Sequence, residues 1–100
     1  MYEVSISGRV EDELVALLNR NPTHAVAINE AFHEIVRRLR IYPQFGDPLR
    51  NLSVPDAQLW VATVGPLVVH YILVEPDDQT QRRLVTVVRP FIPVTGSGIV

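Results

Sequence analysis

The sequence predicts an α+β domain in which an N-terminal strand, an antiparallel hairpin of two helices and three antiparallel strands form one twisted sheet with a helical layer. Three observations predict this class: apolar residues recur at helical spacing in the first half of the chain, strand-like runs follow from Gln58, and prolines and glycines separate the segments. With 100 residues the chain can build one hydrophobic core, so we expect a single domain over residues 1–92. Residues 93–100 contain a proline and two glycines and are expected to form a partly flexible tail.

A strand and a helix are expected first. Residues 2–6, with the sequence YEVSI, alternate as a short strand does. Ser7 suits the N-cap of a helix over residues 8–20, because its hydroxyl can accept a hydrogen bond from a first-turn N–H group. The helix has an apolar stripe made by Val10, Leu14, Leu17 and Leu18.

The second helix has the clearest signals in the chain. Asn21 as N-cap and Pro22 at the first helical position predict its start. Pro43 predicts its end, since the residue before a proline avoids the helical conformation. Few residues separate the two helices, so they should form an antiparallel hairpin. The apolar face of the second helix contains Ala25, Ile28, Phe32, Ile35, Val36 and Leu39.

Three strands are expected from Gln58 onward. The runs QLWVATV, LVVHYILVE and RRLVTVV are rich in β-branched and aromatic residues, and they are separated by Gly65-Pro66 and by the polar PDDQTQ segment. The middle run is apolar on both sides of a strand. One side carries Leu67, Val69, Tyr71 and Leu73, and the other carries Val68, His70, Ile72 and Val74. Two helices can cover only one face of a sheet, so the tail, a second chain or a functional partner must cover the other.

Composition and charge argue against several function classes. The chain contains no cysteine, which excludes disulfides, thiolate catalysis and zinc–thiolate sites. Its basic residues are nine arginines without any lysine, against eleven acids, for a formal net charge of −2. Proteins that bind nucleic acid usually carry a basic excess, so this balance disfavours a large phosphate-binding surface. The sequence shows neither a signal-peptide pattern nor an apolar run long enough to cross a bilayer, so we expect a cytoplasmic protein without a membrane partner.

The histidines give few candidates for chemistry. His24 and His33 are not spaced to place two ligands on one helix face, and no carboxylate completes a cluster, so we expect no metal site and no cofactor. His70 is interpreted as a half-buried strand histidine with one satisfied nitrogen, and an acid–base role is the alternative.

The arginines divide into structural residues and ligand candidates. The second helix ends with three that suit the negative end of its dipole: Arg37, Arg38 and Arg40. Surface ion pairs across a hairpin are expected among Arg82, Arg83, Asp77 and Asp78. Arg50 follows a predicted Gly-Asp-Pro turn, and Arg89 interrupts an apolar run, so these two are the candidates for a ligand. Tyr71 and Arg89 are expected on neighbouring strands, which would place a hydroxyl near a cation.

The element order and two short motifs resemble the RelE/ParE family of toxins from bacterial toxin–antitoxin pairs, which includes plasmid-stabilisation proteins. The motifs are P-x-x-G-x-P-L-R-x-L at residues 43–52 and G-P-L-V-V-H-Y-I-L at residues 65–73, and the likeness spans about residues 2–92. The resemblance implies a twisted antiparallel sheet with a helical hairpin on one side and an exposed concave face. In ribonuclease members it implies lysines and arginines that bind the scissile phosphate, with a Tyr, His or Glu for proton transfer.

The resemblance also suggests roles for particular residues. Arg50 matches the basic position after the loop, Arg89 falls near a basic position on the last strand, and Tyr71 matches a tyrosine that is mostly structural in the family. With His70, these residues are the candidate catalytic set. The candidate partner-binding residues are Trp60, Leu67 and Val69, and two of them, Trp60 and Leu67, stand where ribonuclease members have basic residues.

Three functions stay open. The first is a toxin-module protein that acts by protein–protein binding and is neutralised by a cognate antitoxin over the apolar face. The second is an mRNA endoribonuclease that would use Arg50, Arg89 and Tyr71 or His70 on RNA, free or at the ribosome. The third is a non-toxic family remnant that buries the same face in a homodimer. The first is favoured, because the strands are apolar on both sides and the cations are few.

Overall fold

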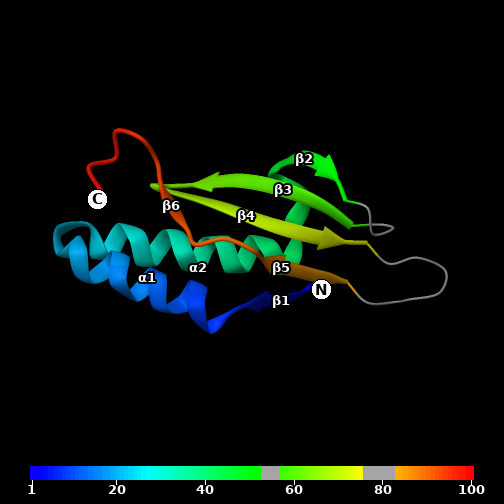
Figure 1. Ribbon diagram of the computed structural model, residues 1–100, viewed down its shortest axis with the longest axis horizontal. Helices are drawn as coiled ribbons and strands as arrows, with labels where there is room; N and C mark the ends of the chain where they lie inside the picture. Colours follow the sequence, from blue (N-terminus) through cyan, green and yellow to red (C-terminus); the bar gives the residue numbers. More distant parts are fainter. Residues whose placement is uncertain (53–56, 76–82) are drawn as a thin grey trace.

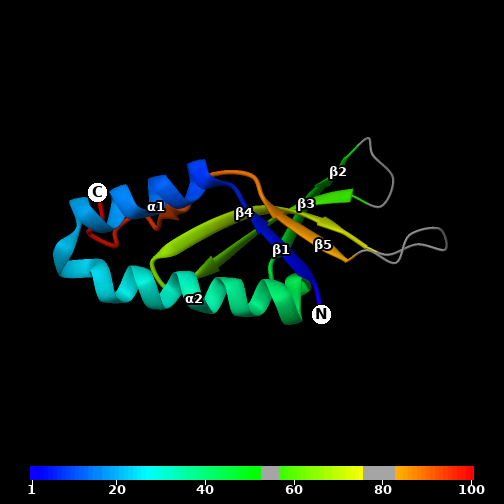
Figure 2. The same ribbon diagram turned by 90° about the horizontal axis from the view of Figure 1, so that it is seen from below.

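The structure is a computed structural model of the chain, and it describes residues 1–52, 57–75 and 83–100. The elements in chain order are β1 (Glu3–Ile6), α1 (Gly8–Arg20), the 3₁₀ turn η1 (Pro22–His24), α2 (Ala25–Ile41), the 3₁₀ turn η2 (Pro43–Phe45), β2 (Asp47–Asn51), β3 (Ala57–Val64), β4 (Leu67–Val74), β5 (Leu84–Val87) and β6 (Ile92–Pro93). The hairpin of α1 and α2 lies on one side of the sheet (Figure 1 and Figure 2). The α+β class is confirmed.

The sheet has the strand order β1-β5-β4-β3-β2, and the short β6 pairs with β4. The strands β3, β4 and β5 are antiparallel neighbours, as predicted. In contrast, β1 runs parallel to β5, so the sheet is mixed. The resemblance implies an antiparallel sheet, and this expectation is wrong for β1. Parallel neighbours need a long connection, and here the helical hairpin and three further strands lie between β1 and β5 in the chain.

The start of α1 follows the sequence prediction, whereas the start of α2 does not. The Ser7 hydroxyl accepts a hydrogen bond from the Val10 N–H at 3.3 Å, and α1 has the predicted bounds. The prediction that the Asn21 side chain caps the second helix is wrong, because its amide instead bonds the Leu17 carbonyl and the main chain of Val100 in the tail. Pro22 begins η1, and α2 starts only after that turn.

The segment after α2 forms an edge strand in place of the predicted turn. α2 ends at Ile41, before Pro43, as predicted. The Gly-Asp-Pro sequence then enters β2, which comprises Asp47–Asn51 and pairs with β3 around an irregular register. A Cβ atom at Gly46 would lie 2.5 Å from the Val61 carbonyl oxygen. Glycine is therefore needed here for a close approach to β3, which the sequence motif alone does not reveal.

A two-residue turn at Gly65-Pro66 joins β3 to β4. Gly65 has a φ of +55°, and Val64 pairs with Leu67 across the turn. Glycine with positive φ at the first central position suits a type II′ hairpin. The turn fixes the register of β3 and β4, and this register decides which side chains share a face.

The core lies between the helical hairpin and one face of the sheet. The helices contribute Val10, Leu14, Leu17, Ile28, Ala31, Ile35 and Leu39. The strands contribute Trp60, Ala62, Val64, Leu67, Val69, Tyr71, Leu73, Val85 and Val87. Phe91, beyond β5, is also buried, and its ring meets Phe32 edge-on with centroids 5.5 Å apart. Within the described residues, neither helix combines the length and hydropathy of a membrane span.

A polar network ties β1 to the end of β4. The Tyr2 hydroxyl donates to Glu75 Oε2 at 2.9 Å, and Gln44 Nε2 donates to Tyr2 Oη at 2.9 Å and to Glu75 Oε1 at 2.6 Å. The Arg83 guanidinium lies 6.0 Å from the centroid of the Tyr2 ring. Burial is the main cause that raises the pKa of Tyr2. These contacts hold the edge strand β1 at the end opposite the helical turn.

Candidate functional site

The strand β4 separates two surfaces of the sheet, the inner face against the helices and the open face opposite. Its inner-face side chains are almost fully buried, with exposed fractions of 0 % for Leu67, Val69 and Tyr71 and 1 % for Leu73. Its other side chains, Val68, His70, Ile72 and Val74, are half-buried. The predicted alternation is confirmed, and the structure shows which side the helices cover.

The open face extends over neighbouring strands. By register, it includes Val68, His70, Ile72 and Val74 from β4, Val61 and the buried Leu59 from β3, and Leu84 and Thr86 from β5. Two exposed apolar side chains border it. Val88, 39 % exposed, lies beside His70, and Ile92, 45 % exposed, pairs with Val68. In the described part of the chain no helix lies over this face (Figure 1).

His70 lies in the middle of the open face. Its main-chain carbonyl accepts a hydrogen bond from the Val88 N–H, and it pairs with Val61 across the sheet. Its ring atom Nδ1 is buried and has no hydrogen-bond partner among the described residues. Burial, followed by the charge of Arg89, lowers the pKa of His70, so the imidazole is neutral at pH 7. The half-buried position is confirmed, but the predicted hydrogen bond is not found at Nδ1.

Arg50 and Arg89 lie on opposite flanks of the open face. Arg50 belongs to β2 and pairs with Leu59, whereas Arg89 follows β5, and both side chains are exposed. Three strand spacings separate β2 from β5, which amounts to about 14 Å of main chain. The predicted pair therefore brackets the open face, and only Arg89 comes close enough to His70 to affect its pKa.

Tyr71 belongs to the core and not to a catalytic site. Its hydroxyl donates a 2.5 Å hydrogen bond to the Pro43 carbonyl, and its ring stacks on Phe45 and on Trp60 with centroid distances of 6.4 Å. Burial raises the pKa of Tyr71 to about 12. The proposed pairing of the Tyr71 hydroxyl with Arg89 is corrected, because Tyr71 points to the inner face.

The predicted partner-binding residues also need reassignment. Trp60, Leu67 and Val69 lie in the core between the sheet and the helices. Leu67 and Val69 have no accessible surface, and Trp60 is only 9 % exposed, so a partner cannot contact this set without opening the fold. A strand that is apolar on both sides does not indicate which side the helices cover, and this is why the sequence placed the contacts on the wrong face.

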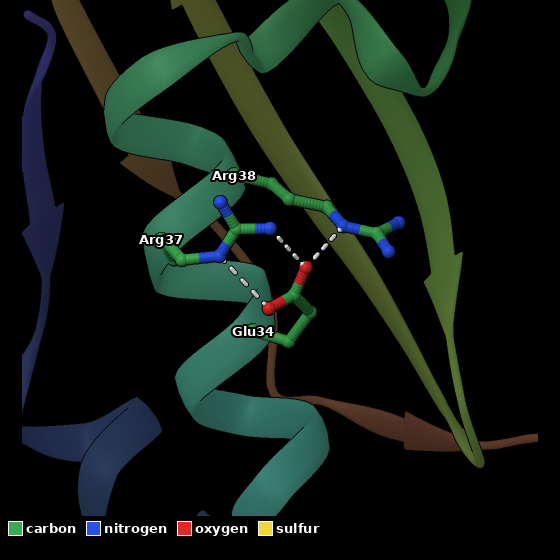
Figure 3. Close-up of polar contacts among 3 residues, drawn as sticks. All are labelled: Glu34, Arg37 and Arg38. Carbon is green, nitrogen blue, oxygen red and sulfur yellow. Dashed lines mark hydrogen bonds and ion pairs between the residues drawn. The ribbon is translucent and has the colours of Figure 1, made fainter.

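The arginines at the end of α2 bind a carboxylate of the same helix. Arg37 donates from Nε at 2.9 Å and from Nη2 at 2.5 Å, and Arg38 donates from Nε at 2.8 Å, to the carboxylate of Glu34 (Figure 3). The hydrogen bonds from Arg37, and then from Arg38, lower the pKa of Glu34 to about 2. The Arg38 guanidinium also lies 5.4 Å from the centroid of the Phe45 ring. Both arginines therefore have protein partners without any ligand.

The remaining candidates are dispersed. His24 Nδ1 lies 3.2 Å from the Thr23 hydroxyl, and His33 is exposed beside Phe32. In residues 1–52, 57–75 and 83–100 no three His, Asp or Glu side chains form a group that could hold a metal ion. The ion pairs predicted for Arg82 with Asp77 and Asp78 lie outside the described residues.

A hollow of about 270 Å³ lies beside the end of α2, at the edge of β3. It is lined by Arg38, Phe45, Gly46, Asp47, Val61, Ala62 and Thr63. Its two charged residues have opposite signs, and Arg38 is already bonded to Glu34. The hollow therefore lacks the convergent cations that a phosphate group requires.

The open face, with His70 at its centre and Arg50 and Arg89 at its flanks, is the candidate functional site. It is a mainly apolar surface with two separated cations, which suits contact with another macromolecule better than chemistry on a small substrate. Comparisons with protein-family models, with curated proteins and with solved structures find no match for this chain.

Proposed function

We propose that this chain is a protein-binding module of the RelE/ParE toxin type whose open face is covered by a cognate antitoxin. The observation that carries the proposal is the apolar open face, which stands opposite a fully packed inner face on the same strand. A partner with an apolar surface would remove this area from water, and such burial is the dominant favourable term in protein association.

The fold is compatible with the proposal. A strand, a two-helix hairpin and a following set of strands occur in the order that the resemblance implies, with the helices on one side of the sheet. A fold hosts many functions, so the functional argument depends on the open face and not on the architecture.

The charges favour a protein over a polyanion as the partner. RNA binding depends on several cations that follow the phosphate backbone. Here Arg50 and Arg89 stand on opposite flanks, and apolar strand residues lie between them. A polypeptide with apolar side chains in its centre and carboxylates at two edges would match this pattern.

An mRNA endoribonuclease is the second candidate, and the proximity of His70 and Arg89 is the observation that favours it. An imidazole with a lowered pKa can accept a proton at neutral pH, and a nearby guanidinium can stabilise negative charge. Tyr71 cannot take part, because its hydroxyl is buried and bonded to Pro43. The enzyme would therefore use His70, Arg89 and Arg50.

Coexpression with the product of a neighbouring short reading frame tests the first function. We expect the wild-type chain to copurify with such a product, and Ile72→Glu, in the centre of the open face, to weaken the complex by at least about tenfold. The matched control is Val26→Glu, on α2 and 72 % exposed, which should leave the complex unchanged. Isothermal titration of the separated proteins gives the affinities.

Two further measurements separate the candidates. Light scattering of the chain alone detects a homodimer over the open face, which would favour the third, non-toxic function. RNA cleavage that disappears in the Arg50→Ala, Arg89→Ala double variant would favour the endoribonuclease. A monodisperse monomer that binds neither a hydrophobic dye nor the neighbouring product would contradict the protein-binding proposal.

A further inference from the structure

Among the described residues, Asn21 is the only buried one with a polar side chain, and its exposed fraction is 4 %. It follows α1 at the turn between the two helices. Its Nδ2 donates to the Leu17 carbonyl at 2.8 Å, which anchors the side chain to the end of α1. The rest of its hydrogen-bonding capacity is directed away from the helices, to a residue that is 79 positions later in the sequence.

That residue is Val100, and Asn21 binds both of its main-chain groups. The Val100 N–H donates to Asn21 Oδ1 at 2.8 Å, and the Val100 carbonyl accepts from Asn21 Nδ2 at 2.8 Å. Arg20 Nε adds a 3.4 Å contact to the same carbonyl. A side-chain amide that pairs with the N–H and C=O of one residue acts as a neighbouring strand does, and it binds a main chain whatever its side chain. The Val100 side chain is 78 % exposed and contributes little to recognition.

The tail over residues 94–100 has one further apolar anchor. Ile99 packs against the core cluster, whereas Gly96 and Gly98 hold the arc before it with φ values of +86° and +83°. A Cβ atom at Gly98 would lie 3.4 Å from Nε2 of His24, so glycine also permits the close approach to η1. Glycine loses more conformational freedom on ordering than any other residue, which makes this attachment easy to release.

The other end of the tail is attached to the sheet. The Val94 N–H donates to the Pro66 carbonyl at 2.8 Å, and β6 pairs with Leu67 and Val68 of β4. The tail thus runs from the β3–β4 turn to the turn between α1 and α2 and closes that end of the layer (Figure 1). The pairing of β6 is short, and Pro93 has no N–H to donate.

We propose that Asn21, oriented by the Leu17 carbonyl, and the apolar surface against which Ile99 packs form a peptide-binding site that holds residues 94–100 as a releasable latch. The site recognises a main chain through Asn21 and an aliphatic side chain through the apolar surface under Ile99. When the latch opens, Phe91 remains in the core and β6 remains paired with β4, so release is confined to residues 94–100. The latch does not depend on the function proposed above.

Hydrogen exchange of the full chain, measured by NMR, tests the latch. In the wild type we expect the Val100 amide to exchange at least about tenfold more slowly than in a free peptide, as one part-buried hydrogen bond allows. The variant Asn21→Leu should restore free-peptide exchange at Val100 while the amides of Val69 and Leu73 stay protected. The matched control is Asn19→Leu, an exposed position on α1, which should leave Val100 protected.

The variant Ile99→Asp provides an independent test, since it alters only the apolar contact of the tail and leaves Asn21 in place. We expect it to release the Val100 amide and to bind a synthetic peptide of residues 94–100 at millimolar concentration, which the wild type with its occupied site should not. Three results would overturn the proposal. They are free-peptide exchange at Val100 in the wild type, equal loss of protection at Val69 and Val100 in Asn21→Leu, and no binding of the peptide to Ile99→Asp.

Discussion

Val68 and Val69 are adjacent on β4 and chemically identical, yet the sheet places them in different environments. Val69 lies on the inner face without accessible surface, whereas Val68 is half-buried on the open face. The same contrast repeats along the strand for the pairs that follow. The comparison shows that side-chain type does not separate residues that stabilise the fold from residues available to a partner, because the face of the strand decides.

The two faces also differ in how completely their polar atoms are satisfied. On the inner face the Tyr71 hydroxyl bonds the Pro43 carbonyl. On the open face His70 Nδ1 is buried and has no hydrogen-bond partner. Among the described side chains, it is the only buried nitrogen or oxygen without one. Buried polar atoms usually have a hydrogen-bond partner, so this nitrogen is an exception that distinguishes the open face from the inner face.

The largest expected effect comes from substituting the two neighbouring valines. Val69→Ala should lower the free energy of unfolding by about 2–3 kcal/mol, through lost burial and the cavity left behind. Val68→Ala should lower it by less than about 1 kcal/mol, since part of its surface is already in water. Urea unfolding followed by circular dichroism measures both. Equal losses would mean that the open face is as closely packed as the inner one.

Removing a single hydroxyl group on the inner face should have the next largest effect. Tyr71→Phe leaves the Pro43 carbonyl without its buried donor and should cost about 1–3 kcal/mol of unfolding free energy. The control is Tyr42→Phe, because Tyr42 is 60 % exposed and its hydroxyl can bond water. Chemical denaturation of the two variants provides the comparison. If Tyr71→Phe were as stable as the wild type, the hydroxyl would not be part of the packing of the inner face.

The parts of the fold that depend on local signals could be predicted from the sequence. The Ser7 hydroxyl and Pro43 mark helix ends through contacts within a few residues, so α1 and the end of α2 lie where expected. The alternation along β4 follows from strand geometry alone. These features need no knowledge of distant residues.

The incorrect predictions concern residues whose environment is set by distant segments. Asn21 is a residue type that is common at helix N-caps, but the tail residue that it binds lies 79 positions later in the sequence. Gly46 reads as a turn residue, yet it is required because β3 passes beside it. Trp60 and Tyr71 were placed at a functional surface, since nothing local shows which side of the strands the helices cover. The burial of Tyr71 could be anticipated only from the mostly structural tyrosine that it matches in the family that the chain resembles.

The pH dependence of stability should report the burial of His70 on the open face. Its pKa in the folded state is below the ordinary value of 6.5. The unfolded chain therefore binds more protons below pH 6.5, and stability falls as the pH is lowered from 6.5 through the folded-state pKa. We expect His70→Gln to flatten this part of the profile. Urea midpoints between pH 5 and 8 measure the profile, and an unchanged slope in His70→Gln would show that the open face does not disfavour the imidazolium.

The smallest effect is expected on α2, away from both faces of the sheet. Glu34 has a pKa of about 2 because Arg37, and then Arg38, donate hydrogen bonds to it, so its stabilising contribution is present above pH 4.5 and is lost as the pH falls towards 2. Arg37→Gln should raise the pKa of Glu34 in an NMR titration, while the control Arg20→Gln on α1 should not. The pair is exposed to solvent and screened, so the decrease in unfolding free energy at neutral pH should be the smallest of the effects predicted here. A Glu34 pKa that stayed near 2 in Arg37→Gln would mean that Arg38 alone accounts for it. Arg37 would then be free for an anionic partner, and the case for a partner without phosphate groups would lose one of its supports.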